Sequence, residues 1–264
     1  MQRRSFVSSL AISPLLGMLG GHAHAQVSDL SDAINKAGRQ RMLSQRMGKA
    51  WLALVHGIEK PSARGVLDKS MALFDRQLVE LKAFAPNAEI KTTYSQLEAV
   101  WSEYKAALVG TAPDKSAALA LLQQDAKVLT LAHQGTVQYE AALGKPLGKL
   151  VNIAGRQRML SQRMAKFYLA ARLPVDASTA ATEIGKARGE FIAAMGQLRN
   201  APEATARIKD ALDLADGQWV FFDMALQRLQ TDQTKKPLTE IYVASENLLS
   251  VMDTVTGLYS AIKT

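Results

Sequence analysis

The chain of 264 residues contains no cysteine. This absence excludes a disulfide framework and a lipid anchor attached to cysteine, so packing must stabilise the fold. No paired carboxylates and no spacing typical of metal ligands stand out, and after residue 25 the only histidines are His56 and His133. We therefore expect a protein that is not an enzyme, with no catalytic residues, no metal and no cofactor, and we interpret both histidines as ordinary helix residues.

Aromatic residues are also scarce, at 6% of the chain, and the three tryptophans (Trp51, Trp101 and Trp219) are typical of core anchors. The formal net charge is +8, which favours anionic partners in general. No known nucleic-acid-binding motif accompanies this charge, so we expect no nucleic acid among the partners.

Long hydrophobic runs are missing after residue 25, where nothing approaches the roughly 20 apolar residues that a membrane helix needs. Residues 1–25 differ, because two arginines precede an apolar stretch and the tripeptide from Ala23 to Ala25 has the small-x-small pattern of a cleavage site. They predict an export signal of the Tat or the Sec type. Removing it would take away two arginines and no acids, lowering the net charge from +8 to +6, and would leave a soluble periplasmic protein.

What the sequence does contain is a long internal repeat. The stretch NKAGRQRMLSQRMGK, residues 35–49, recurs as NIAGRQRMLSQRMAK, residues 152–166. The same offset of 117 residues aligns Phe74 with Phe191. One structural unit has therefore been duplicated.

The periodicity of apolar residues is helical throughout, with Gly and Pro breakers between the periods. Ser62, Asn87 and Asp114 follow three of these breaks as candidate N-caps. The pattern predicts helices over residues 29–57, 62–84, 87–109, 114–143, 147–172, 177–199, 202–231 and 237–262. The fold class is therefore all-α, with two tandem up-down four-helix bundles.

We expect the first unit to span residues 26–143 and the second to span 149–264. Between them lies the stretch GKPLG, residues 144–148, which we interpret as a hinge because its glycines and proline disfavour a continuous helix. A hinge allows the chain to turn back, so we expect the bundles side by side as a pseudo-twofold dimer.

The first repeat has two apolar faces when it is drawn as a helix. One stripe carries small residues around a single arginine, Arg41, and the opposite side carries Leu43 and Met47. Arg158 holds the same place in the second repeat. One face can pack inside its own bundle, and the stripe with the arginine can approach a second helix closely.

A buried guanidinium needs an anionic partner or several hydrogen-bond acceptors. No acidic residue occurs between Ala33 and Leu54, nor between Leu150 and Pro174, so neither first helix supplies one. The partner of each arginine must come from another helix or from solution, and we favour a ligand. Four further arginines lie away from the stripe and are expected to form ion pairs at the bundle edge: Arg39, Arg46, Arg156 and Arg163.

The pattern N-x-A-G-x-x-R-M-x-S-x-R-M resembles the P-box of nitrate and nitrite sensor kinases, and AGRQRMLSQRM resembles the PilJ-type domain of type IV pili chemotaxis transducers. The resemblance implies that Arg41 and Arg158 hold nitrate where two first helices cross. It also implies nearby roles, as neighbouring motif positions, for Gly38, Gly155, Asn35 and Asn152.

We expect neither flanking transmembrane helices nor a cytoplasmic signalling domain, which would set the chain apart from these families. The sequence therefore predicts a soluble binding protein for nitrate or nitrite that presents its bound form to a membrane receptor, transporter or reductase system. It should be a monomer with one site shared by its two halves, or alternatively a homodimer. A second hypothesis is a helical interaction protein that docks on a PilJ-like receptor domain without a small ligand.

Overall fold

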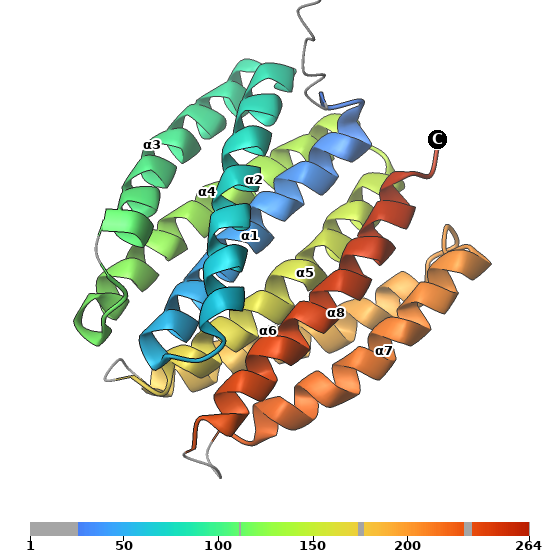
Figure 1. Ribbon diagram of the computed structural model, residues 1–264. Coiled ribbons are helices and arrows are strands. Elements are labelled where there is room, and N and C mark those ends of the chain that lie inside the picture. Colours follow the sequence, from blue (N-terminus) through green and yellow to red (C-terminus); the bar gives the residue numbers. More distant parts are fainter. Residues whose placement is uncertain (1–25, 111, 174–176, 230–233, 264) are drawn as a thin grey trace, which may run out of the picture.

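The computed structural model describes residues 26–110, 112–173, 177–229 and 234–263, and they form two groups of helices (Figure 1). The helices are α1 (Leu30–His56), α2 (Lys60–Phe84), α3 (Ala88–Gly110), α4 (Ala118–Leu143), α5 (Pro146–Ala170), α6 (Ala177–Asn200), α7 (Ala206–Gln227) and α8 (Lys236–Ser260), with a short 3-10 turn, η1 (Lys115–Ala117), before α4. The described part of the chain contains no strand, which confirms the all-α prediction. The predicted export signal lies outside the described residues.

The two groups lie side by side, with α1 and α5 packed against each other in the middle of the molecule (Figure 1). Helix α1 also packs on α2 and α4, and α5 packs on α6 and α8. Helices α3 and α7 are peripheral, since they pack mainly on α4 and α8 respectively. The predicted arrangement of two bundles side by side is confirmed.

The chain reverses between the two groups at Gly144, whose φ of 62° lies in the left-handed region that glycine adopts without strain. Helix α5 then begins with Pro146 in its first turn, where a missing N–H costs nothing. This turn brings α5 back along α1, so the two repeated segments become neighbours.

The predicted helix ends agree with the structure to within about two residues at most positions. Asn87 does accept a hydrogen bond from the Ile90 N–H, as an N-cap should. Ser62 does not cap α2, which begins two residues earlier at Lys60. Helix α7 begins at Ala206 and not at residue 202, because Thr205 caps it by accepting from the Ile208 N–H.

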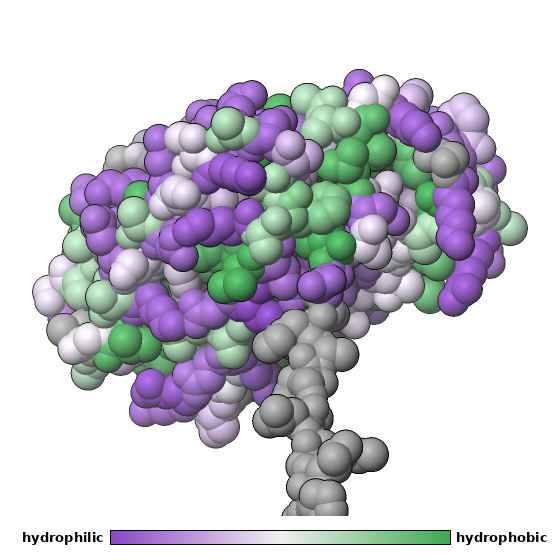
Figure 2. Space-filling view, turned by 90° about the horizontal axis from the view of Figure 1, so that it is seen from above, coloured by the Kyte–Doolittle hydropathy of each residue, from purple (hydrophilic) through white to green (hydrophobic). Residues whose placement is uncertain are grey.

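Each bundle has an aromatic core of the same design. Trp101 stacks on Phe74 at 4.1 Å between ring centroids, and Trp219 stacks on Phe191 at 4.3 Å. These pairs confirm the interpretation of Trp101 and Trp219 as packing residues. Hydrophilic residues cover much of the face in Figure 2, with smaller hydrophobic groups between them.

Candidate functional site

The interface between α1 and α5 buries two arginines that hold the same place in the two repeats. Arg41 on α1 and Arg158 on α5 are both 0% exposed. Each side chain reaches across to the other helix, because an NH2 amino group of Arg41 donates to the Asn152 carbonyl at 3.3 Å and that of Arg158 donates to the Asn35 carbonyl at 3.0 Å. The contacts are reciprocal, as a pseudo-twofold axis requires.

Two glycines make this approach of the guanidinium groups possible. A Cβ atom on Gly38 would lie 3.3 Å from the Arg41 NH2 group and 3.5 Å from the Arg158 NH2 group. On Gly155 the corresponding distances would be 3.8 Å and 3.2 Å. Because these two glycines have no side chain, space remains between α1 and α5, and the NH2 groups of both arginines lie in it.

The two arginines differ in their outer partners. Arg158 donates through NH1 to Asp253 Oδ1 on α8 at 2.5 Å, and Arg39 donates to the same oxygen at 3.0 Å. Arg41 instead donates through NH1 to His133 Nδ1 on α4 at 3.2 Å. Of these two arginines, Arg158 donates to a carboxylate, whereas the partners of Arg41 among the described residues are a histidine, an amide oxygen and a backbone carbonyl.

The two asparagines of the motif support the arginines to different degrees. Asn152 accepts from the Arg41 NH2 group through Oδ1 at 2.6 Å and donates to Glu140 through Nδ2. Asn35 donates to the Ser260 hydroxyl at 3.2 Å, and its buried Oδ1 has no hydrogen-bond partner within the described chain. The structure thus brings all six predicted site residues to one place between α1 and α5.

Burial and the charges of neighbouring arginines lower the pKa of both guanidinium groups. Burial, together with the charges of Arg156 and Arg158, lowers the pKa of Arg41 to about 9. Burial and the charge of Arg39 lower the pKa of Arg158 to about 10, while Asp253 opposes that shift. Both groups remain cations at neutral pH, so the interface carries two buried positive charges.

A second layer of the interface contains two buried lysines that again match by the repeat. Lys49 on α1 donates to the Ser245 hydroxyl at 2.7 Å and to Glu246 at 2.6 Å, both on α8. Lys166 on α5 pairs with Asp125 on α4. Each lysine therefore joins its own bundle to the fourth helix of the other bundle.

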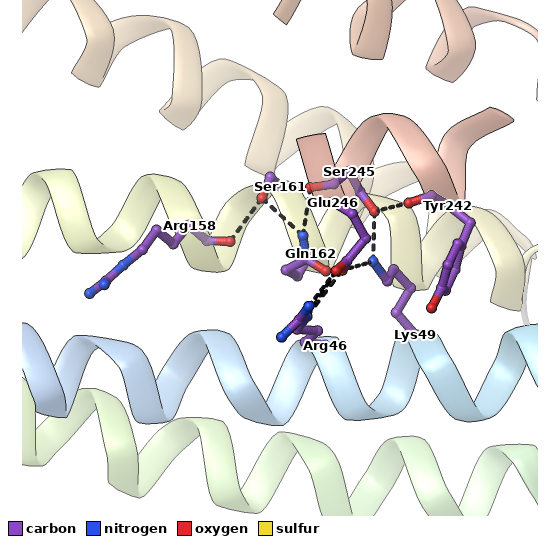
Figure 3. Close-up of polar contacts among 8 residues, drawn as sticks. All are labelled: Arg46, Lys49, Arg158, Ser161, Gln162, Tyr242, Ser245 and Glu246. Carbon is purple, nitrogen blue, oxygen red and sulfur yellow. Dashed lines mark hydrogen bonds and ion pairs between the residues drawn. The ribbon is translucent and has the colours of Figure 1, made fainter. Parts of the chain in front are cut away.

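Glu246 is the main acid on one side of this layer. In Figure 3 it lies between Arg46 and Lys49, and Arg158 extends from α5 toward α1. Arg46 donates to Glu246 through Nε at 3.1 Å. Burial alone would raise the pKa of Glu246, but Lys49 and Arg46 lower it to about 2.

The four arginines expected at the bundle edge all form ion pairs. Their partners are Asp253 for Arg39, Glu246 for Arg46, Glu190 for Arg156 and Glu183 for Arg163. Two of these acids are in the opposite bundle, which sequence patterns on one helix cannot reveal.

Sequence reasoning missed His133 as a neighbour of Arg41, since we interpreted it as an ordinary helix residue. It also missed Asp253, Lys49 and Lys166. The two lysines could have been found, because both lie inside the repeated stretch and are separated by the same 117 residues.

None of the helices in the described residues is long and apolar enough to cross a membrane. Likewise, no group of three or more potential metal-binding side chains occurs among those residues.

The molecule is thus a tandem pair of helical bundles that share a duplicated motif across their interface. The chain matches the family model described as the type IV pili methyl-accepting chemotaxis transducer N-terminal domain, PilJ, over residues 23–131 and 145–243. These segments cover more than half of the chain, so the protein belongs to the PilJ family. No curated protein and no solved structure matches it.

Proposed function

We propose that this protein is a periplasmic sensor that binds nitrate or nitrite between α1 and α5. The observation that carries the proposal is the meeting of two buried guanidinium groups, one from each bundle, over a pair of glycines. The site residues are Arg41, Arg158, Gly38, Gly155, Asn35 and Asn152.

The spacing of the two guanidinium groups suits one small anion. Both NH2 groups lie within 3.5 Å of the Cβ position on Gly38, so they are no more than about 7 Å apart. Hydrogen bonds of about 2.9 Å from both sides take up most of this distance, so an anion that bridges the two groups must be small, with one or two oxygens between them. A planar oxyanion can accept two parallel bonds from each fork.

Unsatisfied donors support an anion at this interface. The Nε groups of Arg41 and Arg158 are buried and have no hydrogen-bond partner in the described part of the chain. A buried donor without an acceptor costs about 1–3 kcal/mol, and an anion would provide acceptors as well as charge compensation.

Ligand binding would compete with contacts that already hold the helices together. The NH2 groups that face the glycines also donate to the Asn35 and Asn152 carbonyls. An anion that draws them away loosens one set of contacts between α1 and α5 and creates another. Binding is then linked to a small shift of α1 against α5, which a partner protein can detect.

Membership of the PilJ family supports a membrane receptor as the partner. Residues 1–25 support export to the periplasm, where such sensory domains operate. In this account the single chain binds the anion and then docks on a receptor, transporter or reductase system.

A second candidate function is docking on a PilJ-like receptor domain without a small ligand. Exposed apolar side chains on α7 favour it, since Leu214, Phe221 and Met224 are 66%, 66% and 52% exposed. Complex formation that needs no anion would distinguish this function from the first.

Thermal unfolding of the chain without residues 1–25 tests the anion site. We expect nitrate, but not chloride or sulfate at equal ionic strength, to raise the melting temperature. Arg41→Lys and Arg158→Lys keep the charge but lose the planar fork, so each should abolish most of the nitrate response.

Arg199→Ala is the matched control, because this arginine pairs with Asp213 and Asp216 on the surface of the second bundle and should leave the response intact. A full nitrate response in either lysine variant would rule out a site shared by the two arginines.

A further inference from the structure

A pocket of about 270 Å³ lies between α4, α5 and α6, and Arg41 is one of its lining residues. His133 on α4 and Arg156 on α5 line it beside Arg41. Leu129 and Met159 form an apolar part of the pocket wall. Arg41, which is 0% exposed and has a buried Nε without a hydrogen-bond partner in the described chain, therefore forms part of the inner wall of this pocket.

The opposite half of the molecule shows what fills the corresponding place there. Tyr139 on α4 donates to the Leu81 carbonyl in the first bundle, and Tyr259 on α8 makes the same contact with the Leu198 carbonyl in the second. Corresponding positions on α4 and α8 are therefore 120 residues apart. By this offset His133 corresponds to Asp253.

The arginines around these two positions also correspond. Asp253 Oδ1 accepts from Arg158 at 2.5 Å and from Arg39 at 3.0 Å. The repeat offset of 117 relates these arginines to Arg41 and Arg156, which line the pocket. One half thus holds an internal carboxylate between two arginines, and the other half has a histidine at that position and a cavity beside it.

The charge of the pocket is positive. Arg41, Arg156, Arg163 and Lys186 face only two lining carboxylates, which belong to Glu183 and Glu190. Burial and the positive charges of Arg41 and Arg156 lower the pKa of His133, which also lines the pocket. Arginine can only donate, so His133 Nδ1 accepts from Arg41 and neutral His133 carries its proton on Nε2, where it is a further donor.

We propose that this pocket binds a small organic carboxylate, whose carboxylate group takes the place that Asp253 takes in the other half. Arg41 and Arg156 contact the carboxylate, and the apolar body of the ligand lies against Leu129, Met159 and Leu160. The volume of about 270 Å³ is several times the roughly 30 Å³ that one water occupies, so the pocket holds a ligand much larger than nitrate. This site shares Arg41 with the proposed nitrate site but does not depend on it.

Calorimetric titration of the chain without residues 1–25 with benzoate and with hexanoate tests the proposal. We expect at least one of these carboxylates to bind, and benzyl alcohol, which lacks the charge, not to bind. His133→Asp places an internal carboxylate where Asp253 lies in the other half, so it should abolish binding of the carboxylate without lowering the melting temperature. Arg156→Ala should weaken binding roughly tenfold or more, and Arg199→Ala should leave it unchanged.

The proposal is overturned if neither carboxylate binds, or if the His133→Asp variant binds them as well as the original chain does. The nitrate response of the same preparation is read separately. Binding of benzoate without a nitrate response would contradict only the proposed nitrate site, and a nitrate response without carboxylate binding would contradict only the pocket.

Discussion

The arginines at the same motif position, Arg41 and Arg158, differ in how their charge is balanced. Asp253 neutralises Arg158, whereas Arg41 faces a histidine and an asparagine. A duplicated site has therefore become unequal through substitutions on α4 and α8 while the motif itself was kept.

Sequence reasoning could predict which arginines are buried, because Arg41 and Arg158 lie on a stripe of small residues. It could not predict the partners His133 and Asp253. Both residues lie on helices far along the chain from the motif. They are 120 residues apart, three more than the 117 that separate the two copies of the motif. Packing of α4 and α8 sets that register, and no periodicity on α1 or α5 encodes it.

Glu246 allows a test of the buried charges at the scale of one residue. Its pKa in the folded protein is about 2, below the ordinary 4.5, so the ion pairs stabilise the fold fully above about pH 4.5 and are lost as the pH falls through about 2. Glu246→Gln should therefore lower the free energy of unfolding at pH 7 by roughly 3 kcal/mol, because Lys49 stays buried without its counter-charge.

Urea denaturation at a series of pH values measures this effect. The difference between the original chain and Glu246→Gln should shrink between about pH 4.5 and 2. Glu98→Gln removes an exposed pair with Lys82 and should cost no more than about 1 kcal/mol. A constant difference for Glu246→Gln across that range would contradict the assigned ion pairs.

At the scale of elements, the pair α1 and α5 forms the centre of the molecule. Helical periodicity and Gly or Pro breakers were sufficient to locate the eight helices. The predicted start of α7 at residue 202 was wrong, because Thr205 caps the helix better than the residues around Pro202 do. The backbone hydrogen bonds of the whole turn decide between such neighbouring caps.

An introduced disulfide tests the crossing of α1 and α5. A Cβ on Gly38 would lie 3.8 Å from the Gly155 Cα, which is close enough for a disulfide between these positions. The chain has no cysteine, so the double variant Gly38→Cys with Gly155→Cys carries the only thiols. Mild oxidation should link α1 to α5 within one chain, as mass spectrometry of a proteolytic digest would show.

The single variants serve as controls, because each can form only a disulfide between two chains. If the double variant also gives only links between chains, the two glycines do not face each other within one molecule.

At the scale of the whole molecule, duplication has placed two copies of one motif in a single polypeptide. A chain with a single copy would need a second subunit to bring two motifs together. Here the turn at Gly144 and Lys145 brings α5 alongside α1, so both copies of the motif meet without a second chain. We propose that one chain carries one complete anion site.

The most direct test is calorimetric titration with nitrate, combined with sedimentation velocity at the same protein concentrations. We expect one nitrate bound per chain, by a protein that sediments as a monomer, with an affinity that does not change with protein concentration. One nitrate per two chains, or binding that appears only when a dimer forms, would contradict it.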